Sequence, residues 1–251
     1  MSAASLLSRL AVTAPLLVGL AACAVRTLEI PPEGRLEIVG PGKVFDIDGL
    51  AADWLVGGDS GAAEERLRVV TLDGVPALRV DGGRDTFSLV RRTNARLLVS
   101  PYLSWSWRMQ PPRKGAHPLQ IIVGFHGGRP DARSRGAQPL VWTGSDLPPH
   151  DRLMAFVYGP SGLLRGSFMP APLDADGKPK PMVPQLVVRG GPESANAWRL
   201  DTVDLSRQYR ARWPGDDLVA TRISFIGFAY LPRKDVKATP RGYLSGLVLS
   251  R

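Results

Sequence analysis

The chain has 251 residues, of which 44% are apolar, a normal share for a globular protein with a full hydrophobic core. Its formal net charge is +9, and its single cysteine excludes a disulfide within the chain. The basic residues are scattered and form no dense run, which is typical of a solvated basic surface. The alternative is a surface that attracts anionic phosphates, sugars or lipid headgroups.

The first 22 residues predict a cleaved secretory signal. Arg9 supplies the positive end, and the apolar run from Leu10 to Ala22 is shorter than the roughly 20 residues needed to span a bilayer. The sequence Leu20-Ala21-Ala22-Cys23 resembles the bacterial lipobox. In that family a diacylglycerol is attached to the cysteine and the leader is cut just before it. The resemblance implies a lipid on Cys23; the alternative is an ordinary signal peptide followed by a chance cysteine.

The same resemblance implies a location. In Gram-negative lipoproteins an aspartate after the lipidated cysteine usually directs retention in the inner membrane, and Ala24 stands there in this chain. We therefore expect a lipid-anchored protein of the cell envelope, on the outer membrane and facing the periplasm. Because an exported protein does not meet nucleic acid in the cytoplasm, we expect no nucleic-acid partner. The membrane, through Cys23, is the expected partner.

The mature chain divides into a lipidated tether, residues 23–39, and one domain, residues 40–251. Residues 24–34 contain Pro31, Pro32 and Gly34, which fits a short tether. Strands and turns follow. Two apolar runs, residues 68–72 and 77–80, flank Asp73-Gly74, which predicts a tight hairpin because this turn requires positive φ.

Residues 103–109 alternate strictly between apolar and polar, the pattern of a strand with one buried face. Trp105 and Trp107 are therefore expected in the core. Further apolar runs rich in Val, Ile, Phe and Trp, separated by Gly and Pro, predict more strands. These runs are residues 119–125, 153–158, 185–188, 198–205, 223–231 and 243–249.

One short helix is expected at Arg207–Trp213, with Ser206 as its cap and Pro214-Gly215 as its stop. Residues 127–152 and 170–184 read as long loops, which are uncommon without a function or mobility. Many short strands without alternating helices indicate an all-β fold. We predict a jelly-roll-like β-sandwich with one short helix and long loops.

Several short motifs resemble an uncharacterised bacterial exported family known as domain of unknown function 3047. This family is itself similar to the jelly-roll sandwiches of carbohydrate-binding modules, and the resemblance covers residues 40–251. It implies the same β-sandwich fold and, by analogy of fold, a glycan ligand. The motifs are Leu103-Ser104-Trp105-Ser106-Trp107, Ile121-Ile122-Val123-Gly124-Phe125, Trp198, Val203-Asp204-Leu205, Tyr209 and Ile226-Gly227-Phe228-Ala229.

The sequence contains no recognisable catalytic or metal-binding motif. Its three histidines, His117, His126 and His150, have no metal-ligand spacing, and the serine-hydrolase motif G-x-S-x-G is absent. The adjacent pairs Glu64-Glu65 and Asp216-Asp217 do not set the separation that glycosidase carboxylates need. We therefore assign no catalytic residue, no metal and no cofactor.

Four residues are predicted to form one ligand-binding surface. Gln120 and His126 share a face of one strand because strand faces repeat every two residues. Tyr158 ends a second strand, and Trp142 belongs to the loop between the two strands. The two aromatic rings would stack on a ligand, while the two polar groups would direct hydrogen bonds. The alternative is that the second sheet packs over this face and buries it.

The expected function is non-catalytic binding in the cell envelope, with a glycan as the first candidate ligand. Two alternatives stay open: a polysaccharide hydrolase of the envelope, and a scaffold that binds another envelope protein. Fold analogy alone does not separate them.

Overall fold

The structure is a computed structural model that describes residues 27–40, 45–46, 49–50, 54–112, 114–130, 147–233, 235 and 239–251. The signal sequence, Cys23 and Trp142 lie outside the described residues. The elements are β1 Arg35–Val39, β2 Phe45–Asp46, β3 Gly49–Leu50, β4 Leu55–Gly58, α1 Ser60–Arg66, β5 Leu67–Leu72, β6 Val75–Val80, β7 Phe87–Arg96, β8 Tyr102–Met109, β9 Leu119–His126, β10 Arg152–Gly159, η1 Gly162–Leu164, β11 Gln185–Gly190, η2 Pro192–Ser194, β12 Arg199–Asp204, α2 Leu205–Arg212, β13 Arg222–Tyr230 and β14 Gly242–Ser250.

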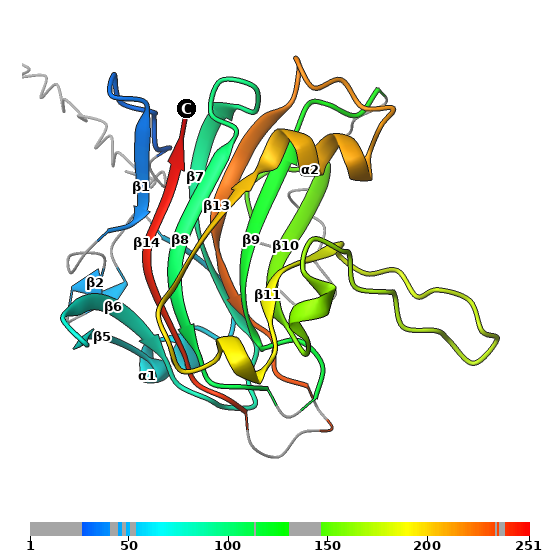
Figure 1. Cartoon of the computed structure of the whole chain (residues 1–251). Helices are drawn as coiled ribbons and strands as arrows, with labels where there is room; N and C mark the ends of the chain where they lie inside the picture. Colours follow the sequence, from blue (N-terminus) through cyan, green and yellow to red (C-terminus); the bar gives the residue numbers. More distant parts are fainter. Residues whose placement is uncertain are drawn as a thin grey trace, which may run out of the picture.

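Two six-stranded sheets pack face to face and confirm the predicted all-β sandwich. The β8 sheet has the order β12-β8-β14-β6-β5, and β1 also pairs with β14. The β9 sheet has the order β11-β10-β9-β13-β7-β4. Among the described strands of this sheet, β10 and β11 pair in parallel and the other neighbours pair antiparallel. Figure 1 shows β14 and β8 on one side of the sandwich and β9 and β10 on the other.

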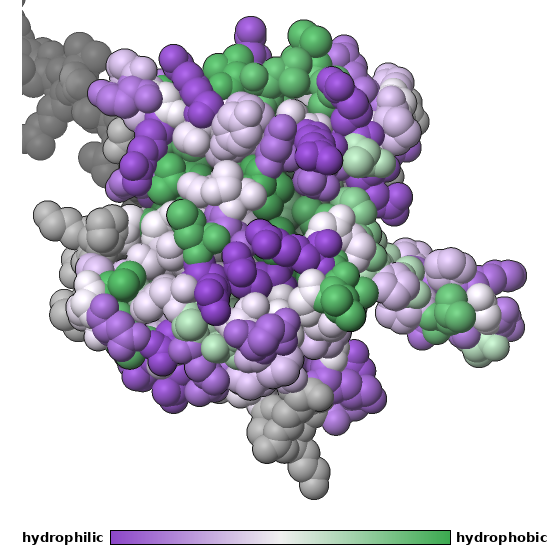
Figure 2. Space-filling view, viewed as in Figure 1, coloured by the Kyte–Doolittle hydropathy of each residue, from purple (hydrophilic) through white to green (hydrophobic). Residues whose placement is uncertain are grey.

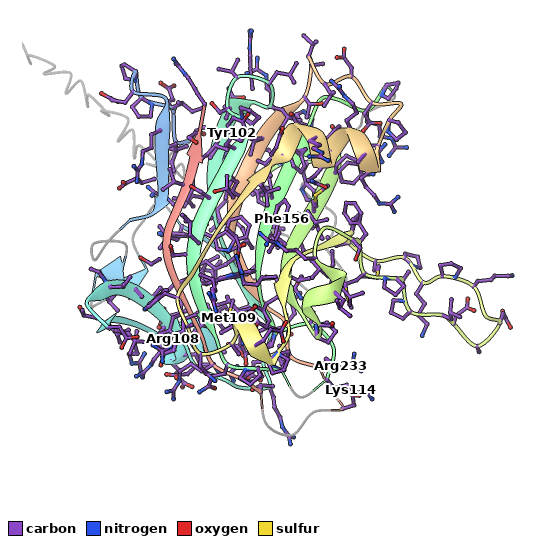
Figure 3. The ribbon with its side chains drawn as sticks, in the orientation of Figure 1. Tyr102, Arg108, Met109, Lys114, Phe156 and Arg233 are labelled. Carbon is purple, nitrogen blue, oxygen red and sulfur yellow. The ribbon has the colours of Figure 1, made fainter. Side chains whose placement is uncertain are left out.

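The core lies between the sheets and is rich in aromatic rings. Trp105 and Trp107 point inward from β8, as expected, and their ring centroids lie 5.3 Å apart with the rings nearly perpendicular. Phe156 approaches Trp105 from the β9 sheet at 5.9 Å, and Figure 3 labels it near the centre of the sandwich. Ile121, from β9, faces the same core.

The Asp73-Gly74 turn forms as predicted. Both residues have positive φ, 52° and 76°, and they join β5 to β6 in an antiparallel hairpin. β1 lies within residues 23–39, the range assigned to the tether, and it pairs with β14. The last residues of that range, from Arg35, are therefore part of the β8 sheet.

The helices differ in detail from the prediction. α2 begins two residues before the predicted start, because Asp204 and not Ser206 caps it by accepting a hydrogen bond from Arg207 N at 3.0 Å. It ends before the expected Pro214-Gly215 stop. A second helix, α1, was not predicted. Asp59 caps α1 by accepting from Ala62 N. No described helix has the length and apolar character needed to cross a membrane.

The two ends of the sandwich are distinct. At the α2 end, Tyr102 pairs with both Asp204 and Ser250, and Arg96 pairs with Arg222. At the opposite end, which we call the pocket end, Gly242 pairs with both Met109 and Val80. Figure 1 shows α2 and the C-terminus at the upper end and the start of β14 at the lower end.

Candidate functional site

Of the predicted ligand-binding residues, the structure describes Gln120, His126 and Tyr158, and it does not bring these three to one surface. On β9, Ile121 faces the core, so Gln120 and His126 face the outer side of the β9 sheet. The sheet register pairs Gln120 with Val157 of β10, and the next residue, Tyr158, therefore faces the core. Gln120 and His126 therefore share a strand face, as predicted. The prediction that Tyr158 joins them is wrong, because its side chain points to the opposite side of the β9 sheet.

Tyr158 is a core residue with a specific contact. Its ring packs against Trp107 at 6.2 Å, and its hydroxyl donates to the carbonyl oxygen of Gly191. Burial raises the pKa of Tyr158 above its ordinary value. Gln120 is also buried, and its Oε1 accepts no hydrogen bond from a described residue. Neither side chain is placed to meet a ligand from solvent.

His126 is partly exposed at the α2 end. Its Nδ1 lies 3.0 Å from Oδ2 of the buried Asp151, close enough for an ion pair but not aligned as a hydrogen bond. The same oxygen accepts the N–H of Gly127 at 2.7 Å. Among the described residues, no serine, threonine or cysteine bonds to His126, and no group of three or more His, Cys, Asp or Glu side chains could hold a metal.

A polar cavity of about 400 Å³ opens at the pocket end, within the size range of small-ligand sites. Three segments form it: the β6–β7 connection, the residue after β8 and the residues before β14. Its lining residues are Asp81, Gly82, Gly83, Arg84, Gln110, Thr239 and Arg241.

Asp81 organises the charges of this pocket. Its Oδ1 accepts from Arg241 Nε at 2.5 Å, and its Oδ2 accepts from Arg79 Nε at 3.0 Å. The neighbouring Tyr243 hydroxyl, and next the Asp81 carboxylate, hold the pKa of Arg241 above its ordinary value. Two guanidinium groups are thus fixed around one carboxylate.

The remaining lining groups include free hydrogen-bonding capacity. Gln110 Oε1 accepts Arg241 N at 2.8 Å, while its amide nitrogen donates to no described residue. Arg84 is exposed and has neither an ion pair nor a hydrogen bond with a described residue. A side chain at Gly82 would place its Cβ 2.3 Å from the Thr239 carbonyl oxygen, so glycine allows the two walls to approach.

An aromatic pair lies beside the pocket on the outer face of the β8 sheet. Tyr243 pairs across the sheet with Arg79 and with Arg108, and it forms an edge-to-face contact with Trp198 at 6.5 Å. Trp198 Nε1 donates to the Leu72 carbonyl at 3.2 Å, which fixes its ring. Figure 3 shows Arg108 near the lower end of β8 and Tyr102 at the upper end of the same strand.

Sequence reasoning missed this pocket. Its residues come from three segments far apart in the chain, and none belongs to a recognisable motif. The one available signal was Gly82-Gly83 directly after the apolar run 77–80, which marks a close backbone approach. Because Arg79 and Asp81 are two residues apart, the sequence indicates that they share a strand face, but it does not show that Arg241 is their partner.

Other buried carboxylates have structural partners. Asp201 accepts from Trp107 Nε1 at 2.8 Å and from Arg189 through both oxygens. Asp216 holds Arg152 in the same two-bond geometry, which is the first cause of the lowered pKa of its carboxyl. The first pair joins β12 to β11, which are edge strands of the two sheets, and the second joins the loop after α2 to the start of β10.

The fold places the chain among jelly-roll-like β-sandwich proteins. No protein-family model matches the sequence, and no curated protein matches it. Among solved structures, a family 30 carbohydrate-binding module is similar at 12% identity, covering 86% of this chain and 99% of its own, with a TM-score of 0.39. The family 30 module of a Clostridium thermocellum cellulosomal cellulase is 12% identical, with 86% of this chain and 96% of its own covered and a TM-score of 0.40. A Bacillus licheniformis family 12 xyloglucanase is 12% identical, with 90% of this chain and 97% of its own covered and a TM-score of 0.39. Likeness at this level concerns the fold alone.

Proposed function

We propose that this chain is a lipid-anchored envelope protein whose sandwich binds a glycan without catalysis, in the pocket around Asp81 and Arg241. The observation that carries the proposal is the cavity of about 400 Å³ with fixed donors and acceptors along its walls. The aromatic pair Trp198–Tyr243 beside it supplies the apolar contact.

A sugar hydroxyl both donates and accepts hydrogen bonds, so a glycan site needs both kinds of partner. Asp81 offers carboxylate lone pairs, while Arg84 and the Gln110 amide nitrogen offer donors. The Tyr243 ring offers a face on which the C–H groups of a sugar could pack. Because Asp81 holds Arg241 in place, little side-chain entropy is lost on binding.

The lining favours binding over hydrolysis. Asp81 is the only carboxylate among the described residues that line the pocket. Glycoside hydrolysis ordinarily uses two carboxylates that flank the scissile bond.

Replacing Gln110 with alanine, or Tyr243 with alanine, is expected to weaken glycan binding about tenfold each, the effect of losing roughly 1.4 kcal/mol of interaction. The measurement is calorimetric titration of the Cys23→Ser chain with the best polysaccharide from a panel of neutral and acidic glycans. Leu163→Ala, at a side chain 97% exposed and outside the pocket, is the matched control. Glycan binding that survives both pocket substitutions would place the site elsewhere, and binding to no glycan in the panel would reject the function.

The lipid anchor is tested separately. Cys23→Ser is expected to move the protein from the membrane to the soluble fraction when membranes are washed in high salt. High salt is needed because it screens the attraction between a basic protein and anionic lipid. A variant that stays with the membrane under these conditions contradicts the lipid anchor but leaves glycan binding untouched.

A further inference from the structure

The α2 end carries a basic helix face. Leu205 and Tyr209 are the buried residues of α2 and pack into the core. Arg207, Arg210 and Arg212 are all exposed on the remaining surface of the helix. Because the core covers the apolar side of α2, the helix presents only its basic side to solvent, and basic segments are attracted to anionic membrane surfaces.

Exposed aliphatic side chains border this helix. Leu98 and Val99, in the β7–β8 turn, are 46% and 47% exposed, and Val219, in the loop after α2, is 78% exposed. Backbone hydrogen bonds join the three segments: Leu97 N donates to Thr221 O, and Leu205 N donates to Pro101 O. Figure 2 shows apolar patches among hydrophilic ones at this upper end.

The nearby carboxylates are engaged in the fold and do not pair with these arginine side chains. Asp204 caps α2, and Asp216 is bound by Arg152 and Tyr209. Asp217 accepts the backbone N–H groups of Val219 and Ala220. Positive charge therefore dominates the α2 side of this end. Beyond it, the turn before β1 and β1 itself carry Glu33, Arg35 and Glu37.

We propose that the α2 end docks on a bilayer that contains anionic phospholipids. The arginines of α2 would bind the lipid phosphates, because guanidinium groups match phosphate geometry and basic segments are attracted to anionic leaflets. Leu98, Val99 and Val219 would enter the interfacial region, where apolar side chains gain from leaving water.

The course of the chain supports the same orientation. Leu28 forms a bridge with Thr93 of β7, so the described chain starts near the α2 end. Cys23 and Thr27 are four residues apart, a distance of at most about 14 Å when extended. A lipid on Cys23 would therefore hold this end close to the bilayer. Docking, however, is a property of the described surface and rests on neither the lipid nor glycan binding.

The test uses the mature chain, residues 23–251, with Cys23→Ser, so that neither the apolar leader nor an acyl chain contributes. Sedimentation is measured with vesicles of phosphatidylcholine alone and with added phosphatidylglycerol. We expect binding only to the anionic vesicles, and a loss of about tenfold or more in the double variant Arg207→Glu, Arg210→Glu. The matched control is Lys178→Glu, Lys180→Glu, an equal charge change on the 170–184 loop, where both lysines are exposed.

A further variant, Leu98→Ser with Val219→Ser, separates insertion from attraction by charge. Both side chains are exposed, so the fold is expected to keep its stability. Binding should fall several-fold even at low salt. Equal losses in the arginine and lysine variants, or no binding to anionic vesicles, would overturn the proposal. So would capture of a soluble acidic polysaccharide through the same arginines when vesicles are not bound.

Discussion

Replacing Trp105 with alanine is expected to lower the free energy of unfolding by about 3–5 kcal/mol, the cost of removing a large buried aromatic ring. Trp105 is fully buried, and its ring contacts Trp107 from its own strand and Phe156 from the opposite sheet. The substitution removes the ring that joins the two sheets and leaves a cavity that β-sheets on both sides cannot close. Urea denaturation of the Cys23→Ser chain measures the loss.

Two comparisons make this result interpretable. Leu163→Ala should change the free energy of unfolding by no more than about 0.5 kcal/mol, because the side chain is 97% exposed. Trp107→Ala should cost at least as much as Trp105→Ala, because it also removes a donor from the buried Asp201. A loss below about 1 kcal/mol for Trp105→Ala would mean that the ring does not hold the sheets together.

The sequence predicts β8 well and misses β7, and the difference has a physical cause. In β8 one face is buried and the other is polar, so the chain alternates from Tyr102 to Met109. In β7 the four residues Phe87–Val90 are buried on both faces, and Arg91-Arg92 follow at once. A strand covered on both sides shows no period of two, and its polar half resembles a loop.

The predicted site failed at a different step. Alternation correctly placed Ile121 on one face of its strand and Gln120 on the other. It could not show that Phe156 pairs with Ile121, and this register is what turns Tyr158 toward the core. Register depends on hydrogen bonding between strands that are distant in sequence, and a shift of one residue exchanges every face.

The pocket and the basic helix face lie at opposite ends of the sandwich. β14 runs from Gly242, beside the pocket, to Ser250, beside the α2 end. A domain docked through α2 would therefore present the pocket away from the bilayer, toward polymers of the surrounding space. The two proposals are independent in their tests but agree in this orientation.

Acid is expected to destabilise the fold through His117. The ring is fully buried beside the pocket, where Nδ1 accepts Leu119 N at 3.0 Å and Nε2 lies 3.3 Å from the Arg241 carbonyl oxygen. This pattern requires the neutral ring with its proton on Nε2. Burial lowers the pKa of His117 from 6.5 to about 4. Below pH 6.5 His117 is therefore protonated in the unfolded chain but still neutral in the folded chain, so the free energy of unfolding falls as the pH decreases toward 4.

The lost stability amounts to about 3 kcal/mol at pH 4, since each unit of pKa difference corresponds to about 1.4 kcal/mol. His117→Asn removes this titration and retains an acceptor for Leu119 N. The variant should be less stable than the parent at neutral pH, because it lacks the contact with Arg241. Between pH 6.5 and 4 the difference between the two proteins should shrink by about the same 3 kcal/mol, whereas above pH 6.5 it should stay constant. Carboxylates titrate in both proteins and cancel in the comparison. A difference that stays constant down to pH 4 would show that His117 does not carry the acid sensitivity.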